Sequence, residues 1–247
     1  MVIAGAGPAG SVAAKKCAAA GLKCLLVEKA KPPRNKVCSG MLMGSIAQGI
    51  IKSEFGEIPG DVLVEPLRLK GYMIHYPGAD DTAVEWPTPI GWRKDIDHWL
   101  NRRAIESGAA FRDETRVLAV EKTGRAFKVK LERRGKVEEA AARYVIGADS
   151  ANSAVRRSLY PELTVKYVQN YRECYRGAKI SLEPGYFHAV FLPGAGLVYQ
   201  AAHQKDGCLL LEMGAGMGKV KAQAERFREH LRKAYGLEPG IEPTWRD

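Results

Sequence analysis

The sequence lacks any long hydrophobic run: among its 247 residues, no apolar stretch approaches the roughly 18–20 residues that cross a bilayer. This absence argues against a membrane-spanning protein. The opening MVIAGAG also lacks the basic leader of a secretory signal peptide. With 46% hydrophobic and 27% charged residues, the chain has the composition of a globular protein of one or two domains.

Cysteine and histidine are sparse and are not spaced as metal ligands. The five cysteines are an odd number without any CxxC pair, which favours a reducing cytoplasm over a disulfide framework. His75, His188 and His203 have no partners at metal-ligand spacing. We therefore predict a cytoplasmic protein without a metal site.

Acidic residues are in deficit: 28 Asp and Glu face 38 Lys and Arg, for a net charge of +10. The basic residues are scattered without an interleaved aromatic platform, so we predict no nucleic-acid partner. Solvated helix faces are the favoured interpretation, and attraction to a phosphorylated cofactor or an anionic membrane surface stays open. The basic segment 219–235 has a thin apolar face, which favours packing on its own domain, with at most peripheral contact at the inner membrane face.

The chain begins with the pattern of a βαβ unit. Met1–Ala4 predicts a strand, Ala9–Ala20 a helix, and Lys23–Glu28 a second, buried strand. Between the first two lies GxGxxG, whose glycines permit a tight turn, the approach of a pyrophosphate, and close packing of helix on strand. The helix N-terminus then offers unpaired N–H groups to the phosphate.

Glu28 lies 18 residues after Gly10, close to the ~20 expected for an acid that accepts from a ribose hydroxyl. The alternative is an ordinary glycine-rich turn followed by a surface glutamate. The βαβ unit alone is compatible with either NAD or FAD.

The rest of the chain predicts more mixed α/β structure. Alternation indicates antiparallel strands between Leu67 and Trp86, and again from Pro161 to about Gly218. Helical spacing and composition predict further helices, and short apolar runs predict further strands. The helices are expected over 41–55, 94–107, 154–159 and 219–235, and the strands over 116–122, 126–133, 136–141 and 144–148.

Five segments together resemble the geranylgeranyl reductase family, flavoproteins of the p-hydroxybenzoate hydroxylase fold. They are GAGPAGSVAA at 5–14, VEK at 27–29, PRNKVCSG at 33–40, GWRKDIDHWLNRRAIESGA at 91–109 and GADSANSAVRRSL at 147–159. The resemblance implies a Rossmann-like FAD-binding domain over 1–65 and 91–160, with an inserted, mostly antiparallel β-sheet substrate domain over 66–90 and 161–247. Family members continue with a glycine–aspartate segment that we do not find, so we expect the chain to be C-terminally incomplete.

The resemblance also implies a set of site residues. Arg34 and Arg93 would contact the phosphates or the adjacent sugar of FAD, or else form surface ion pairs. Asp149 would lie near the pyrophosphate and ribitol or cap the following helix, and Arg156 would hold Asp149 or the cofactor. Ser150 stands where the superfamily has glycine. The full cofactor-binding set is Gly5, Gly7, Pro8, Ala9, Gly10, Glu28, Lys29, Arg34, Cys38, Ser39, Gly40, Arg93, Asp149 and Arg156.

Cys38 is the one catalytic candidate. It occupies the family's cysteine–glycine–glycine position, written here Cys38-Ser39-Gly40. The resemblance would place the thiol facing the isoalloxazine, where it could tune the flavin or help protonate a substrate carbon. The alternative is a buried apolar cysteine.

Three functions stay open from the sequence. The first is an FAD-dependent oxidoreductase that reduces carbon–carbon double bonds of an isoprenoid or lipid-like substrate by hydride transfer from reduced flavin, refilled by NAD(P)H or a redox donor protein. The second is an FAD-dependent aromatic-ring monooxygenase. The third is a truncated, non-catalytic nucleotide-binding fragment.

Overall fold

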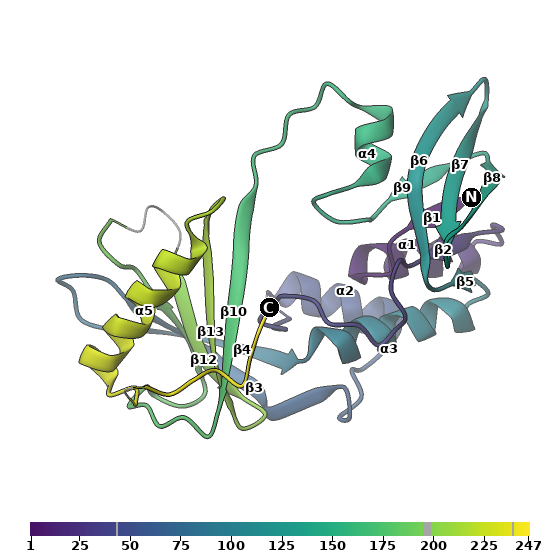
Figure 1. Cartoon of the computed structure of the whole chain (residues 1–247). Coiled ribbons are helices and arrows are strands. Elements are labelled where there is room, and N and C mark those ends of the chain that lie inside the picture. The colour runs from purple at the N-terminus through teal and green to yellow at the C-terminus, as the bar shows by residue number, and fades with distance from the viewer. Residues whose placement is uncertain (43, 195–198, 239) are drawn as a thin grey trace. The chain divides into compact units, whose positions relative to one another are not determined.

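The computed structural model describes residues 1–42, 44–194, 199–238 and 240–247 (Figure 1). The chain divides into two compact units, each with its own core. Unit 1 comprises Met1–Lys36, Glu54–Gly56 and Lys94–Lys166, and unit 2 comprises Val37–Ser53, Glu57–Arg93 and Tyr167–Asp247.

Unit 1 is built on a four-stranded parallel sheet in the order β5-β2-β1-β9. The chain runs through β1 (Val2–Ala4), α1 (Pro8–Ala19), β2 (Leu25–Val27), α3 (Arg93–Glu106), β5 (Ala110–Arg112) and β9 (Val145–Gly147). Because all four strands run parallel, the turn that follows β1 lies at the carboxyl edge of the sheet. That edge is where open α/β sheets bind ligands.

Each face of the parallel sheet buries apolar side chains against another layer. On one face, Ile3 and Leu26 pack with Ala14 of α1 and Ala104 of α3. On the other face, valines of β1 and β2 pack against a three-stranded antiparallel sheet (Figure 1). That sheet comprises β6 (Thr115–Thr123), β7 (Ala126–Arg133) and β8 (Lys136–Ala142), and α4 (Ala154–Leu159) follows β9.

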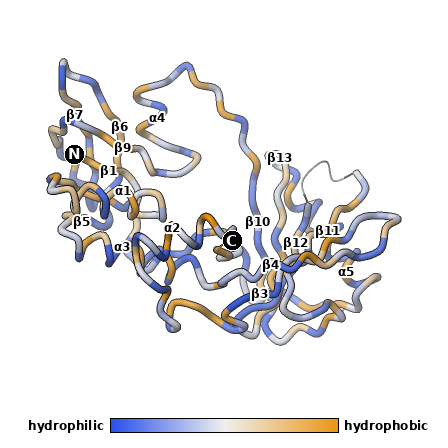
Figure 2. Tube along the Cα trace, turned by 180° about the vertical axis from the view of Figure 1, so that it is seen from behind, coloured by the Kyte–Doolittle hydropathy of each residue, from blue (hydrophilic) through white to orange (hydrophobic). Residues whose placement is uncertain are grey.

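Unit 2 is built on a seven-stranded sheet in the order β14-β10-β13-β12-β11-β3-β4. All neighbours pair antiparallel except β11 and β3, which are parallel. Its strands are β3 (Leu63–His75), β4 (Thr82–Gly91), β10 (Val168–Arg176), β11 (Tyr186–Val190), β12 (Gln200–Lys205), β13 (Cys208–Gly216) and β14 (Trp245–Arg246). Strand β10 is hydrophilic along much of its length (Figure 2).

Helix α5 (Val220–Tyr235) covers one face of this sheet. Its stripe Val220, Ala224, Phe227 and Leu231 is buried against Leu209, Leu211 and Met213 of β13 and their neighbours. The apolar face of the predicted basic helix is thus used in packing, as the sequence favoured. The opposite face of the sheet carries Phe187 and Ala201, packed with Met41, and Cys174 and Leu210, packed with Trp92 and Trp245.

The predicted α/β class is confirmed, and most predicted elements form within a few residues of the expected bounds. The predicted start of a helix at Met41 is wrong: Met41 forms a β-bridge with Ile90, and α2 (Ser45–Phe55) begins only after Gly44. Met43 and the predicted strand residues 195–198 lie outside the described residues. No helix of the described chain is long and apolar enough to cross a membrane.

Candidate functional site

The turn between β1 and α1 presents an uncapped helix N-terminus. Gly7 is the N-cap of α1 and therefore has no side chain to accept from the first-turn N–H groups, while Pro8 occupies the first turn. The first turn holds no acidic residue, and Pro8 and Ala9 are exposed. The partial positive charge of this helix end is therefore available to an anion.

Two glycines of the cradle, Gly5 and Gly10, have no room for a side chain without a shift of the backbone. Gly5 has φ +93°, a conformation that favours glycine. A Cβ on Gly10 would overlap the carbonyl oxygen of Gly5, so α1 can approach the strand only because this position has no side chain. These are the tight turn and the close helix–strand packing that the motif predicted.

Glu28 is buried, not a surface residue, at 4% exposure. Its carboxylate accepts from the backbone N–H of Ala6 inside the cradle and from the N–H of Ala30, each at 3.1 Å. The side chain thereby fixes the turn between β1 and α1 from the end of β2. A carboxylate oxygen has two lone pairs, so Oε1, which accepts from the N–H of Ala30, keeps capacity to accept from a ribose hydroxyl.

Arg34 joins two buried carboxylates. Its Nε lies 3.2 Å from Glu28 Oε2, and its Nη1 donates to Asp97 Oδ2 of α3 at 2.9 Å. Its Nη2 lies 3.7 Å from the point where a Gly7 side chain would begin, so the guanidinium borders the cradle. The alternative to a phosphate contact, an ion pair, is therefore present, but it is buried and lies beside Gly7 in the cradle.

Asp149 caps α4, which was the structural alternative to a cofactor contact. Its carboxylate accepts from the N–H groups of Ala154 and Val155, at 2.6 and 3.3 Å, and from the Ser153 hydroxyl at 2.5 Å. Ser153 in turn accepts from the N–H of Arg156. Ser150 has φ +73°, the left-handed conformation that explains why glycine is usual at this position.

The remaining residues predicted in unit 1 lie at its surface or on α4. Lys29 is exposed directly after Glu28. The Arg156 guanidinium donates to the carbonyl of Ala151 at 2.6 Å. Arg93, by contrast, is half-buried at the start of α3 and belongs to unit 2.

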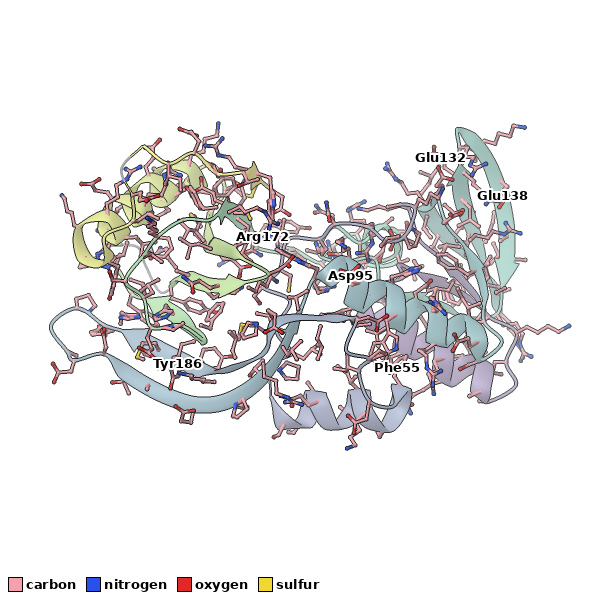
Figure 3. All side chains as sticks on the ribbon, turned by 90° about the horizontal axis from the view of Figure 1, so that it is seen from below. Phe55, Asp95, Glu132, Glu138, Arg172 and Tyr186 are labelled. Carbon is pink, nitrogen blue, oxygen red and sulfur yellow. The ribbon has the colours of Figure 1, made fainter. Side chains whose placement is uncertain are left out.

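The segment Cys38-Ser39-Gly40 also belongs to unit 2, where two buried cations hold its backbone. Cys38 is half-buried, and its Sγ accepts from the N–H of Gly40 at 3.5 Å. Arg172 of β10 donates to the carbonyl of Cys38 at 2.7 Å, and Lys205 of β12 donates to the carbonyl of Ser39. Figure 3 shows Arg172 among the side chains of this unit.

Sequence reasoning missed Asp97, Arg172 and Lys205. Asp97 and Asn101 are both buried beside the apolar stripe of α3. Their spacing of four residues places them on one face of a helix next to Ile96 and Leu100, so the sequence pattern could have predicted their burial. Alternate residues of β12 share one face of the strand, and on this buried face Lys205 follows Ala201 and His203. Its partners lie 114 and 166 residues away along the chain, so no local pattern reveals them.

The cradle fits the diphosphate of a dinucleotide. An uncapped helix N-terminus, an opening at Gly7 beside a guanidinium and a buried acid at the end of β2 are the donors and acceptor that such a group requires. No cluster of three His, Cys, Asp or Glu that could hold a metal ion exists among the described residues.

Comparison with known proteins points to the same cofactor. Two family models, each described as an FAD binding domain, match residues 1–47 and 85–170. The first covers the cradle together with Glu28 and the Cys38 segment, and the second covers α3, Asp149 and α4. FAD, and not NAD, is therefore the dinucleotide to which these segments are related.

Named relatives are reductases. The geranylgeranyl diphosphate reductase of Rhodobacter capsulatus is 33% identical over 177 residues, covering 69% of this chain and 42% of that protein. A digeranylgeranylglycerophospholipid reductase of Methanopyrus kandleri is 32% identical over 182 residues, covering 68% and 44%. The chain thus spans about two fifths of the length of these relatives.

Solved structures define the fold. A geranylgeranyl bacteriochlorophyll reductase-like protein of Thermoplasma acidophilum superposes with a TM-score of 0.81 over 99% of this chain and 64% of its own, at 20% identity. A flavin-dependent brominase superposes with a TM-score of 0.73 over 100% of this chain and 67% of its own, at 18% identity. At these identities the likeness shows the fold alone.

The fold and the glycine cradle define the chain as a flavoprotein of the p-hydroxybenzoate hydroxylase-like type, as the sequence predicted. Within that class, the predicted resemblance is confirmed: the chain is a homologue of the geranylgeranyl reductases, a family of FAD-dependent oxidoreductases.

Proposed function

We propose that this chain is the FAD-binding and substrate-facing part of an FAD-dependent oxidoreductase that reduces carbon–carbon double bonds of an isoprenoid or lipid-like substrate. The observation that carries the proposal is the cradle at the end of β1, where an uncapped α1, the Gly7 opening, Glu28 and Arg34 converge. The names of the relatives supply the substrate class.

Each predicted site residue has a proposed role. The N–H groups of Gly7, Ala9 and Gly10 form the wall against which the diphosphate rests, Pro8 begins the helix beside them, and Glu28 accepts from the ribose. Arg34, Arg93 and Arg156 add positive charge for phosphate and sugar, with Lys29 at the rim. Asp149, oriented by Ser153 and the first turn of α4, presents its carboxylate toward the ribitol.

Bound FAD would supply the redox chemistry, because reduced flavin donates a hydride to an electron-poor or protonated double bond. The protein's part is to orient the cofactor and shield it from water. Cys38, Ser39 and Gly40 are proposed to meet the flavin ring, with the Cys38 thiol placed to hold or pass a proton. NAD(P)H or a redox donor protein is proposed as the source of electrons.

The proposal is tested by replacing Gly7 with aspartate. A side chain at position 7 meets nothing closer than the flexible end of Arg34, and aspartate is a favoured N-cap. The Gly7→Asp variant is therefore expected to be as stable as the parent or more so, by about 0.5 kcal/mol. Its negative charge occupies the phosphate position, so FAD affinity, measured by fluorescence titration, is expected to fall at least about tenfold.

Gly7→Asn is the matched control. Asparagine has nearly the same shape and also caps helices, but it carries no charge. It is expected to lose clearly less FAD affinity than Gly7→Asp. Equal losses in the two variants would mean that no phosphate rests at this helix end, and the assignment of the cradle would be wrong.

Turnover distinguishes the three functions that the sequence left open. A yellow preparation that reduces a prenyl substrate without oxygen supports the reductase. Consumption of oxygen together with NAD(P)H and hydroxylation of an aromatic ring supports the monooxygenase. A colourless chain that FAD cannot reconstitute supports the non-catalytic fragment.

A further inference from the structure

Lys205 is a buried lysine whose ammonium group lies within no ion pair of the described chain. It is 1% exposed, and its Nζ donates to the carbonyls of Ser39 and of Gly91, the latter at 3.1 Å. The indole ring of Trp92 lies 4.1 Å from Nζ. Burying a cation is costly unless its donors are used, so a lysine directed at backbone carbonyls indicates that their position matters.

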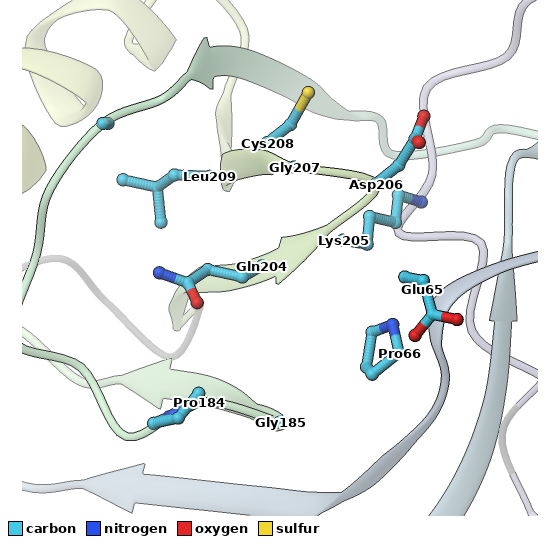
Figure 4. Close-up of a pocket in the computed structure, with 11 residues that line it drawn as sticks. Glu65, Pro66, Pro184, Gly185, Gln204, Lys205, Asp206, Gly207, Cys208 and Leu209 are labelled. Atoms are coloured by element: carbon cyan, nitrogen blue, oxygen red, sulfur yellow. The ribbon is translucent and has the colours of Figure 1, made fainter.

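The lysine reaches the loop from inside the sheet. Figure 4 shows Lys205 and the preceding Gln204 leaving opposite sides of β12, beside a cavity of about 340 Å³ lined also by Glu65, Pro66 and Cys208. Lys205 thus lines this cavity and also contacts the backbone at Ser39, the residue after Cys38.

Arg172 holds the same loop from β10. It is 4% exposed, and its Nη1 donates to the Cys38 carbonyl at 2.7 Å. The remaining donors, Nε and Nη2, form a fork with the two oxygens of Asp247 at 2.9 and 2.6 Å. The ring of Trp245 lies 4.8 Å from the guanidinium carbon. Such a bidentate pair fixes the guanidinium plane and hence the carbonyl that it binds.

The loop itself has little freedom to lie elsewhere. Gly40 has φ +77°, and a Cβ there would overlap the carbonyl oxygen of Gly91. The carbonyl of Gly40 accepts from the N–H of Gly91 at 3.1 Å, and Met41 bridges to Ile90. The consecutive carbonyls at 38, 39 and 40 are therefore all bound, which fixes the backbone from which the Cys38 side chain extends.

We propose that Lys205 and Arg172 are positioning residues that hold the Cys38-Ser39-Gly40 backbone in one conformation and so set the direction of the Cys38 thiol. The proposal deepens the function proposed above, since Cys38 is its catalytic candidate. It concerns contacts within unit 2 alone and can be tested before any flavin is bound.

The charged groups around Lys205 make the clamp sensitive to pH. Burial, followed by the nearby Arg172, lowers the pKa of Lys205 to about 8, against the opposing pull of Glu212, Cys38 and Asp206. Burial raises the pKa of Glu212 to about 7 on the neighbouring strand, while burial and the two cations keep the pKa of His203 well below its usual value. Loss of the Lys205 proton above pH 8 removes the charge that strengthens both carbonyl contacts.

The test measures alkylation of Cys38 by iodoacetamide in the 247-residue chain, with Cys17 of α1, also half-buried, as internal reference. Peptide mass spectrometry gives the ratio of the two rates. In Lys205→Met at pH 7 the rate for Cys38 relative to that for Cys17 is expected to rise by about tenfold. This is the factor that corresponds to about 1.4 kcal/mol in the free energy of opening the loop. Lys205→Arg is expected to restore most of the parental ratio, and Lys70→Met, at an exposed lysine of β3, to leave it unchanged.

The pH profile distinguishes positioning from general stability. The parental ratio is expected to change between pH 7 and 9, with a midpoint near the pKa of about 8, and the ratio in Lys205→Met to stay flat. The proposal would be overturned if Lys205→Met had the same alkylation ratio as the parent, or if the ratio depended on pH in the same way in both proteins. FAD is expected to protect Cys38. Absence of protection would contradict the flavin contact of the loop, while the clamp would stand on the alkylation ratios alone.

Discussion

Glu28 shows how one side chain can define a site through backbone contacts. Its two oxygens accept from the N–H of Ala6, in the turn after β1, and from the N–H of Ala30, just after β2, while Arg34 supplies the neutralising charge. The same carboxylate therefore shapes the turn and stands ready for a ribose. Removal of Arg34 would leave Glu28 and Asp97 as buried carboxylates, which explains why this arginine cannot be treated only as a cofactor ligand.

Ser150 provides a prediction at the scale of one residue. It is exposed and its backbone has φ +73°, a conformation that is strained for any residue with a Cβ atom. Ser150→Gly is expected to raise the free energy of unfolding by about 0.5–1 kcal/mol, since relief of the left-handed strain exceeds the entropy that glycine loses on folding. Urea titration of the chain measures it. Ser150→Ala is the control and should give no gain; equal stability of the glycine and alanine variants would contradict the explanation.

Helices and strands could be predicted from the sequence where the segment itself has a clear hydrophobic periodicity. The βαβ start, the 116–141 strands and α5 could be predicted because turn glycines and apolar spacing mark them. The strands β5 (AFR) and β14 (WR) were not predicted, because they lack the apolar runs that mark β1, β2 and β9 and are defined by their pairing with β2 and β10. The cradle was predictable for the same local reason, whereas Asp97, Lys205 and Arg172 act through partners distant in sequence.

The packing of α5 on the sheet includes a buried ion pair between Arg228 of the helix and Glu173 of β10. Glu173 of β10 is fully buried, and Arg228 donates to it at 2.5 Å while Tyr175 donates at 2.7 Å. Burial alone would raise the pKa of Glu173, but these hydrogen bonds lower it below its usual value. The carboxylate is thus charged at neutral pH, and Arg228 is its nearer cationic partner, with Arg246 of β14 at 3.6 Å.

Arg228→Met is expected to lower the free energy of unfolding by about 3 kcal/mol at pH 7, because it removes the nearer cation from a buried carboxylate and leaves only the longer pair with Arg246. Chemical denaturation measures the loss. Lys233→Met on the same helix, at a surface pair with Glu229, is expected to cost less than about 0.5 kcal/mol. The double variant Glu173→Gln/Arg228→Met should recover part of the loss, and an additive double variant would contradict the role assigned to the charge.

At the scale of the whole molecule, stability should depend on pH through buried histidines. Burial lowers the pKa of His188, His203 and His230 below 6.5, so the folded chain keeps these rings neutral. His188 donates to the Glu183 carbonyl and borders His75, whereas His203 packs against Phe187 without a hydrogen-bond partner in the described chain. As the pH falls below about 6.5, these histidines therefore bind protons in the unfolded chain but stay neutral in the folded chain.

The direction in which pH changes the free energy of unfolding follows from the numbers of protons that the folded and unfolded states bind. The contribution of His203 is fully present above pH 6.5 and is lost as the pH falls below that value, because only the unfolded state gains the proton. Glu212 acts in the opposite direction between pH 4.5 and about 7, so the histidine effect must be isolated by difference. His203→Leu is expected to gain stability relative to the parent as the pH is lowered from 6.5 to 5, by up to about 2 kcal/mol, at 1.36 kcal/mol per pH unit. Urea unfolding at several pH values gives this difference. A constant gap between parent and variant over that range would show that His203 takes up its proton in the folded state and that the charge is accommodated on this face of the sheet.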